Sequence, residues 1–497
     1  MTASPTGVVA DEQWQRLDPR MLLVHPIREV LRFFPVLIGL FVFGRASGDA
    51  DVPWQLLGIV LPVALGILRY LTTSFRITTD RIELRRGLLN RHLLSVRLDR
   101  VRTVDATASP IQRVLGLTTV RVGTGTASTS DEDRVDLDGL PVDRARALRI
   151  DLLHAGPRAV EELEAAEAAP VREVLRLDPA WARFAPLTSS GVVVAAAILG
   201  VGSQVLDGIG GPGFGFEATL SRVDGSWWLA LVAIPVLVAA VSALAVAGYL
   251  VANWGFTLTH APDTRSWHLR RGLFTTRETS LDDERLSGVS IGEPIGLRLA
   301  RGGRLSAIVT GLDRSQSGSS LLVPPAPRAV VAGVAGDVLG THEPVTATLR
   351  SHGSRARTRR FTRALVPALL LATPVILVVA SGAPPWLLVI AVVMIAAAAF
   401  LALDRARALG HVLTSRHFVT RSGSLFRQRQ ALSHAAIIGW NLRATWFQRR
   451  AGLTTLQATT AGGSQSVTAL DVPEPDAVAV ASAAVPGLVD QFLAPPD

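Results

Sequence analysis

Three times along this chain, an apolar segment leads into a stretch rich in alternating β-forming residues. In the clearest case, the apolar residues 54–71 precede FRITTDRIELRRGLLNRHLLSVRLDRVRTV at 75–104. At about 1.5 Å per residue, a helix over 54–71 would span roughly 27 Å, close to the apolar thickness of a bilayer. The alternating residues predict strands. The chain is therefore expected to combine membrane helices with small β domains.

The apolar residues gather in six segments that form three pairs. The segments cover 31–44, 54–71, 185–205, 227–252, 364–383 and 385–403. Each segment alone could be a buried core helix, but six of them in three hairpins predict six transmembrane helices. The first segment contains Arg32 and Pro35 and reaches spanning length only with its polar flanks. A mean hydropathy of +0.34 over 497 residues agrees with this interpretation.

The distribution of arginine predicts an orientation. All 50 basic residues are Arg, and they crowd the long segments 72–184 and 253–363, whereas the links inside the pairs are short or acidic. The positive-inside rule then places both termini and three soluble domains in the cytoplasm of a plasma-membrane protein. The net charge of +9 is expected to reflect this bias and anionic lipid headgroups, with no nucleic-acid partner.

The three β-rich stretches resemble one another. Each has a hairpin glycine, at Gly87, Gly272 and Gly423, and SPIQRVLGLTTVRV (109–122) matches TWFQRRAGLTTLQA (445–458). The middle counterpart, EPIGLRLARGGRLSAIV (293–309), reads as a copy with a small insertion. Each copy then ends in Pro followed by a helical run, and Pro is favoured in the first turn of a helix. The repeats predict three units, each with a membrane hairpin, a β domain and a closing helix.

These units predict nine segments. They are a juxtamembrane segment at 1–30, hairpin 1 at 31–71, β domain 1 at 72–157, a helical linker at 158–184, hairpin 2 at 185–252, β domain 2 at 253–341, a basic linker at 342–363, hairpin 3 at 364–403 and β domain 3 at 404–497.

The sequence shows no set of residues with the spacing of a catalytic or metal site. The chain has no Cys, which excludes disulfides and thiolate chemistry. His411, His417 and His434 lie near one another in the sequence, but no Cys or ordered carboxylate completes a metal site. No cofactor motif stands in the required strand and helix context. We therefore expect no enzyme activity, no cofactor and no metal.

Arginines near the predicted hairpin turns are the candidate site. They are Arg81, Arg85, Arg86 and Arg91 in the first copy, Arg270, Arg271 and Arg277 in the second, and Arg427 and Arg429 in the third. A guanidinium can hold a phosphate bidentately, which predicts binding of anionic lipid headgroups or of a partner protein. The alternative is a solvated strand edge whose charge prevents aggregation.

The chain resembles the bacterial pleckstrin-homology-like (PH-like), membrane-flanked proteins of the YdbT type. In the first copy the matching residues are Ile77, Thr78, Arg81, Arg86, Gly87, Leu88, Leu98, Asp99, Val101, Gln112, Arg113, Gly116 and Leu117. In the middle copy they are Arg271, Gly272, Leu273, Leu281 and Asp282, and in the third Leu413, Thr414, Arg416, Gly423, Gln448, Arg449, Gly452 and Leu453.

This resemblance implies an α+β membrane protein. Each of its three PH-like domains would be a seven-stranded, strongly bent sheet or barrel capped by a C-terminal helix. The expected function is a non-enzymatic scaffold or sensor that binds lipid headgroups, peptides or partner proteins at the bilayer. The alternative is an accessory or core subunit of a membrane transport or export system.

Overall fold

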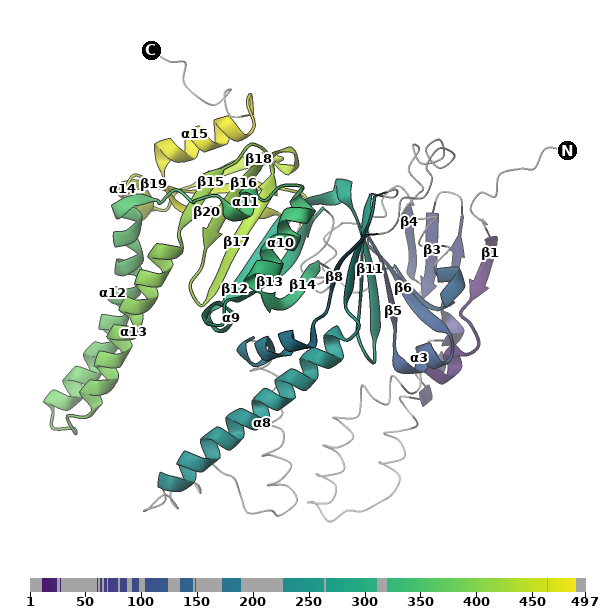
Figure 1. Cartoon of the computed structure of the whole chain (residues 1–497), viewed down its shortest axis with the longest axis horizontal. Coiled ribbons are helices and arrows are strands. Elements are labelled where there is room, and N and C mark those ends of the chain that lie inside the picture. The colour runs from purple at the N-terminus through teal and green to yellow at the C-terminus, as the bar shows by residue number, and fades with distance from the viewer. Residues whose placement is uncertain are drawn as a thin grey trace. The chain divides into compact units, whose positions relative to one another are not determined.

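The structure, a computed structural model, describes most of the chain (Figure 1). The described residues are 11–24, 70–78, 81–86, 92–97, 103–123, 135–145, 172–188, 227–262, 265–310, 320–462 and 464–488, with isolated residues at 27, 60, 63–64, 67–68 and 148. The chain divides into two compact units, Met1–Asp283 and Glu284–Asp497. The division falls inside the stretch 253–341, and each unit is described separately.

The first unit begins with a four-stranded antiparallel sheet. Its strand order is β1 (Asp11–Arg16), β2 (Ser74–Ile77), β3 (Arg81–Arg86) and β4 (His92–Arg97). Alternate residues such as Phe75, Ile82 and Leu84 are buried, and they pack with Leu117 and Leu137 of the second sheet in one core. This alternation is the pattern of a sheet with one buried face.

The second sheet of this unit has seven antiparallel strands. Their order is β7 (Val135–Pro141), β6 (Leu117–Gly123), β5 (Thr103–Ala108), β11 (Thr276–Asp282), β10 (Ser266–Arg271), β9 (Thr257–Ala261) and β8 (Arg172–Arg176). The short helix α3 (Pro110–Val114) joins β5 to β6. The 3-10 helix η3 (Pro179–Leu187) packs against α8 (Trp227–Asn253), which leads into β9.

The second unit holds a six-stranded and a three-stranded sheet. The first has the order β14 (Leu321–Pro327), β13 (Gly302–Val309), β12 (Leu286–Pro294), β17 (Phe426–Ser433), β16 (His417–Ser422) and β15 (Gly410–Leu413). The second has the order β18 (Gly439–Arg443), β19 (Leu453–Thr459) and β20 (Ser466–Pro473).

Helices cover and connect these sheets. They are α9 (Ile295–Leu299), α10 (Arg328–Leu339), α11 (Glu343–Thr346), α12 (Gly353–Ala380), α13 (Leu387–Ala408), α14 (Trp446–Arg450) and α15 (Glu474–Ala484), with 3-10 turns η4 (Asp283–Arg285) and η6 (His434–Ala436). The predicted closing helices appear as α10 after β14 and α15 after β20. The first of them is described only at 142–145 and 148.

Three short helices, α3, α9 and α14, have five residues each and end in the same way. In α3 and α14, Ser109 and Thr445 form capping boxes with Gln112 and Gln448, which satisfies the first amide groups of the helix. Two residues beyond α3 and α14 stand Gly116 and Gly452, at φ +70° and +62°; the same place after α9 is held by Arg301, at φ +57°. The three elements therefore have equal length, and the insertion predicted at 293–309 is absent.

The prediction of six transmembrane helices is wrong. In the described part of the chain only α12 and α13 are long and apolar enough to cross a membrane. The predicted start of the third segment, residues 185–187, belongs to η3. Within α8, the stretch whose side chains are all described, Val238–Asn253, is shorter than the roughly 20 residues that a span needs. Residues 31–44, most of 54–71 and 189–205 lie outside the described ranges. An apolar run in a sequence predicts a segment that avoids water, but it determines neither the length of the helix nor whether protein or lipid covers it.

The β domains also differ from three separate bent sheets or barrels. In the described residues each stretch contributes six strands, β2–β7, β9–β14 and β15–β20, so PH-like β-sheet domains are present. Strand β1 comes from the segment 1–30, and β8 lies in 158–184, which was wrongly predicted to be a helical linker. Yet β5 pairs with β11, and β12 pairs with β17, which are strands of successive stretches. An edge strand exposes unpaired N–H and C=O groups, and pairing with the next edge satisfies them.

Candidate functional site

The helices α12 and α13 pack side by side as a hairpin that extends away from the sheets of the second unit (Figure 1). Only 11% of the apolar stretch of each helix is buried. Leu370 is 68% exposed and Val392 is 64% exposed. A core helix of a soluble protein buries its apolar face, so these exposed faces favour an apolar environment that the described residues do not supply.

The last turn of α13 is fastened to the sheet through Asp404. The Asp404 carboxylate accepts hydrogen bonds from the Ser424 hydroxyl at 2.9 Å, from Arg427 at 2.9 Å and from Arg298 at 3.2 Å. These partners come from the β16–β17 turn, from β17 and from α9. Charge-assisted bonds from two guanidinium groups to one shielded carboxylate are stronger than neutral ones. They fix the direction in which α13 leaves the sheet.

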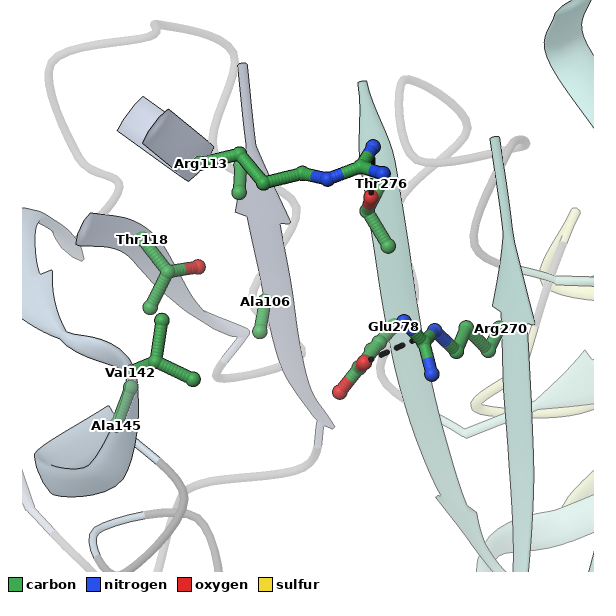
Figure 2. Close-up of a pocket in the computed structure, with 9 residues that line it drawn as sticks. Ala106, Arg113, Thr118, Val142, Ala145, Arg270, Thr276 and Glu278 are labelled. Atoms are coloured by element: carbon green, nitrogen blue, oxygen red, sulfur yellow. Dashed lines mark hydrogen bonds and ion pairs between the residues drawn. The ribbon is translucent and has the colours of Figure 1, made fainter. Parts of the chain in front are cut away.

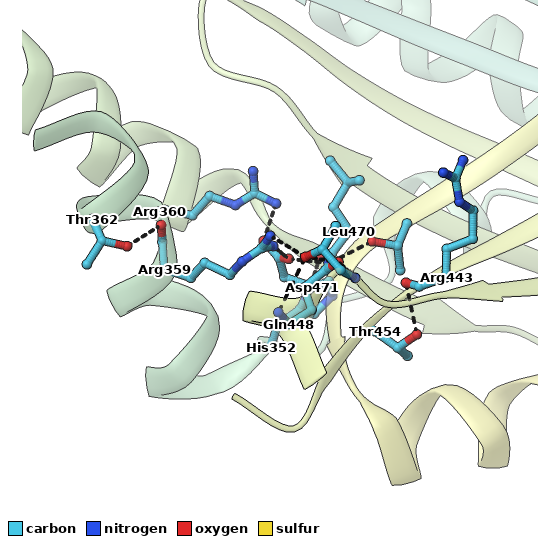
Figure 3. Close-up of polar contacts among 11 residues, drawn as sticks. His352, Arg359, Arg360, Thr362, Arg443, Gln448, Thr454, Leu470 and Asp471 are labelled. Carbon is cyan, nitrogen blue, oxygen red and sulfur yellow. Dashed lines mark hydrogen bonds and ion pairs between the residues drawn. The ribbon is translucent and has the colours of Figure 1, made fainter. Parts of the chain in front are cut away.

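The first turns of α12 are fastened through Asp471 of β20 (Figure 3). Arg359 and Arg360 both pair with the Asp471 carboxylate, and the Gln448 side-chain amide of α14 donates to it at 2.8 Å. Arg359 also donates to the Thr445 hydroxyl at 3.2 Å. Asp471 is 1% exposed, so its charge depends on these partners rather than on water.

The end of the hairpin beside the sheets, which we call the hairpin base, has an excess of positive charge. Beyond the two arginines paired with Asp471, five more lie there: Arg355, Arg357, Arg363, Arg405 and Arg407. A cavity of about 490 Å³ opens at the N-terminal end of α12, and Arg357, Arg407 and the buried His352 line it. A helix N-terminus and two guanidinium groups together favour an anionic group.

Large apolar side chains surround the hairpin base. Phe426 in β17 is 59% exposed, and Trp446 and Phe447 on α14 are 58% and 68% exposed. The turn before Phe426 lies at the end of α13, because the Arg421 guanidinium donates to the Ala408 carbonyl at 3.0 Å. Aromatic side chains beside basic residues at the end of an apolar helix are typical of a membrane–water interface.

The first unit has a comparable arrangement at the end of α8. The amides of Gly272 and Leu273 donate to the Trp254 and Val251 carbonyls, both at 2.9 Å, so the β10–β11 turn lies against the helix end. Phe274 in this turn is 58% exposed. In both units a β-hairpin turn with an exposed Phe therefore adjoins the C-terminal end of an apolar helix.

The predicted arginines of the third copy are engaged inside the protein. Arg427 pairs with Asp404, as described above. Arg429 donates to the carbonyls of Pro344 and Ala347, at 3.0 and 2.9 Å. Burial and the nearby Arg421 lower the pKa of Arg429 to about 10. Neither guanidinium is therefore presented on the surface as an open anion site.

The predicted arginines of the first unit lie on different parts of its sheets. Arg85 stacks over Trp14, 3.7 Å from the ring centroid, and Arg81 is exposed at the start of β3. Burial and the neighbouring Arg277 lower the pKa of Arg271 to about 10. The backbone of Arg86 ends β3, and Arg91 lies outside the described residues. Among the described side chains, Arg271 and Arg277 lie opposite each other in the β10–β11 pair, whereas Arg81 and Arg85 lie on β3 of the other sheet.

Arg270 lines a cavity of about 150 Å³ beside the β5–β11 pair (Figure 2). It faces Glu278 at 3.5 Å. Across the cavity, Arg113 of α3 donates to the Leu273 carbonyl at 2.7 Å and reaches the Thr276 hydroxyl at 3.4 Å. The charges around this cavity are thus mostly paired, and its small volume suits water better than a headgroup.

His411 of the third copy pairs with a second buried histidine, His352. The His411 Nδ1 lies 2.9 Å from the His352 Nε2, and the His352 Nδ1 donates to the Leu470 carbonyl at 2.8 Å. Burial and the neighbouring His352 lower the pKa of His411 to about 4, so the pair is neutral. Among the described residues no group of three His, Cys, Asp or Glu side chains is placed to hold a metal ion.

Sequence reasoning missed the two carboxylates that hold the hairpin and the aromatic residues around it. A visible signal existed for Asp404, the lone acid between an apolar run and the RAR triplet at 405–407. For Asp471 there was none, because only the fold brings β20 to α12. Trp446 and Phe447 stood inside a repeated element and were read as part of its framework.

Comparison with known proteins agrees with the strand pattern of the first and third stretches. Residues 33–155 and residues 365–484 each match the family model of the bacterial PH domain. Each matched region includes a predicted apolar pair and the β-rich stretch after it. No curated protein and no solved structure matches the chain. The chain thus contains bacterial PH-like domain sequence in two regions, one before and one after its middle β-rich stretch.

Proposed function

We propose that this protein is a non-enzymatic membrane scaffold whose PH-like sheets are held at the cytoplasmic leaflet by the α12–α13 hairpin. The hairpin base is its binding site for anionic lipid headgroups. The observation that carries the proposal is the pairing of an uncovered apolar hairpin with a basic, cavity-forming base. The bacterial PH domain match over 365–484 spans this same region and supports a binding role.

The chemistry of the hairpin base favours a phosphate-bearing ligand. Arg357 and Arg407 are both exposed, and they line the cavity at the start of α12. The helix N-terminus adds partial positive charge, and each basic residue near an anionic leaflet contributes about 1 kcal/mol of attraction. The exposed Trp446 and Phe447 would lie at headgroup depth beside them. These features support lipid contact at this place more than at the strand arginines.

The middle stretch is proposed as a third PH-like copy, with the segment boundaries given by the sequence. Its support is geometric, because the closing pairs of the three hairpins, Arg86–His92, Arg271–Arg277 and Ser422–Gln428, enclose loops of equal length. The transport or export alternative has no comparable support in the described residues. Flux through purified protein in vesicles would test it.

Neutralising one arginine of the cavity is expected to weaken the preference for anionic lipid. With the full chain in nanodiscs, Arg357→Gln or Arg407→Gln should lower the association of phosphatidylglycerol relative to phosphatidylcholine by roughly fivefold, as expected for a loss of about 1 kcal/mol. Spin-labelled lipids report this ratio directly.

The matched control is Arg416→Gln, which removes the same charge from an exposed residue at the other end of β16. It should leave the lipid ratio unchanged. Equal losses in all three variants would mean that net charge alone governs the preference. No preference in the wild-type protein would exclude headgroup binding.

A further inference from the structure

Two pairs of successive β-rich stretches are joined edge to edge in the same way. At the β5–β11 junction, five residue pairs run from Thr276–Ala108 to Ser280–Val104. At the β12–β17 junction, seven pairs run from Pro294–Phe426 to Gly288–Leu432. In both, the edge strand that precedes a short helix pairs with the second strand of the next hairpin.

The two junctions share one register. The pairs that close the two hairpin turns are Arg271–Arg277 and Ser422–Gln428. The second residue of each pair lies opposite the residue three positions before the short helix. Arg277 is opposite Thr107, and Gln428 is opposite Gly292. A shift of one residue would turn every side chain to the other face, so a shared register indicates one interface built twice.

The short helices add a second contact at each junction. At the β5–β11 junction the Arg113 guanidinium donates to the Leu273 carbonyl of the β10–β11 turn. At the β12–β17 junction the equivalent Arg298 reaches Asp404, and the Ile295 amide donates to the Leu425 carbonyl at 2.7 Å. Each junction thus joins a strand edge and a helix to one hairpin.

Two edges remain at the ends of this series. Strand β4 is the end strand of its sheet, paired only with β3, and β18 is the end strand of its own, paired only with β19, among the strands that the structure describes. Strand β4 is the second strand of the first hairpin, whereas β18 precedes the short helix α14. Each internal junction pairs one strand of each kind, so β4 and β18 together supply the two strand types that a further junction of this kind needs.

We propose that β18 of one copy of this protein pairs with β4 of a second copy, in the register of the two internal junctions. That register sets His92 opposite Arg443, Leu93 opposite Leu442 and Ser95 opposite Trp440. Leu93 is 56% exposed and Leu442 is 39% exposed, which is unusual for edge strands, where charge normally prevents pairing. Directly opposite side chains in an antiparallel pair touch, so the two leucines cover each other.

The third short helix is also available for this contact. Arg449 stands in α14 where Arg113 and Arg298 stand in α3 and α9, and its guanidinium is exposed, with no hydrogen bond to any described residue. The contact uses different surfaces on the two copies. Such head-to-tail association builds a closed ring or an open row of copies. In either case the assembled copies would present several hairpin bases to the same membrane.

Cysteine cross-linking tests the register, because the natural chain has no Cys. The single variants Leu93→Cys and Leu442→Cys are expressed together as full chains in membranes and oxidised. A reducible covalent dimer is expected, since opposite residues in an antiparallel pair lie within disulfide distance. Arg97→Cys with Ile438→Cys should cross-link as well, since the same register sets these residues opposite each other.

The out-of-register control is Arg97→Cys with Leu442→Cys, whose residues would lie about 13 Å apart along the strands. It should yield at least tenfold less dimer. A chain carrying both Leu93→Cys and Leu442→Cys should form a ladder of covalent oligomers. A fast-migrating monomer would instead show that β4 and β18 of the same chain are joined. Equal cross-linking of the in-register and control pairs, or none in either, would exclude the register. Either result overturns the proposal.

Discussion

Replacing Asp471 by Ala is expected to lower the free energy of unfolding of the second unit by about 3–5 kcal/mol, the cost of breaking a buried ion pair from one side. Arg359 and Arg360 are only 11% and 13% exposed and would lose their shared carboxylate. The Gln448 side-chain amide would lose one of its two acceptors and keep the Thr455 hydroxyl. The first turns of α12 should then detach from β20. Thermal unfolding of the purified protein in nanodiscs, with proteolysis at the 350–363 segment, measures both effects.

The control is Asp476→Ala, in the first turn of α15. Asp476 pairs with Arg350 at 2.9 Å, but Arg350 is 65% exposed, so the loss should stay below about 1 kcal/mol. Similar losses in both variants would mean that the buried pair does not anchor the hairpin.

Acidification is expected to destabilise the second unit through His411. Its pKa is about 4 in the folded protein and about 6.5 in an unfolded chain, so the unfolded state binds more protons between these values. The stabilising contribution is complete above pH 6.5 and is lost as the pH falls from 6.5 towards 4. The total loss is on the order of 3 kcal/mol, because one pKa unit corresponds to about 1.4 kcal/mol.

The measurement is the midpoint of thermal unfolding between pH 8 and pH 4, for the wild type and for His411→Gln. The Gln amide can still donate to His352 but cannot take up a proton. The variant should therefore have a shallower slope than the wild type below pH 6.5, while the two proteins respond alike above pH 7. The remaining slope comes from His352, His417 and His434, because burial lowers their pKa values as well. Parallel curves across the whole range would show that His411 does not control acid stability.

The local hairpin elements were largely predictable from sequence. Gly272 and Gly423 do end strands, at φ +111° and +100°, and a Cβ there would collide with the carbonyl oxygen three residues on. Gln112 and Gln448 close the capping boxes of matching helices. Such features depend on residues close in sequence, so turn and cap chemistry identifies them.

The predictions failed where contacts between residues far apart in the sequence determine the structure. Alternation identifies a strand but not its partner, so the pairing of β5 with β11 could not be foreseen. The middle short helix was misread because Arg301 holds the backbone conformation that Gly116 and Gly452 hold elsewhere. Arg427 and Arg429 have the pattern of surface residues, because nothing in the sequence shows that Asp404 contacts the first and that the Pro344 and Ala347 carbonyls contact the second.

The most direct test of the account is which side of the membrane each end of the α12–α13 hairpin faces. Ser381→Cys marks the exposed link between α12 and α13. Ser415→Cys marks the exposed turn between β15 and β16, in the sheet that follows the hairpin. A membrane-impermeant maleimide should label Ser381→Cys in intact cells and should label Ser415→Cys only after permeabilisation. Labelling of both positions from the same side would contradict a membrane-crossing hairpin with cytoplasmic PH-like sheets.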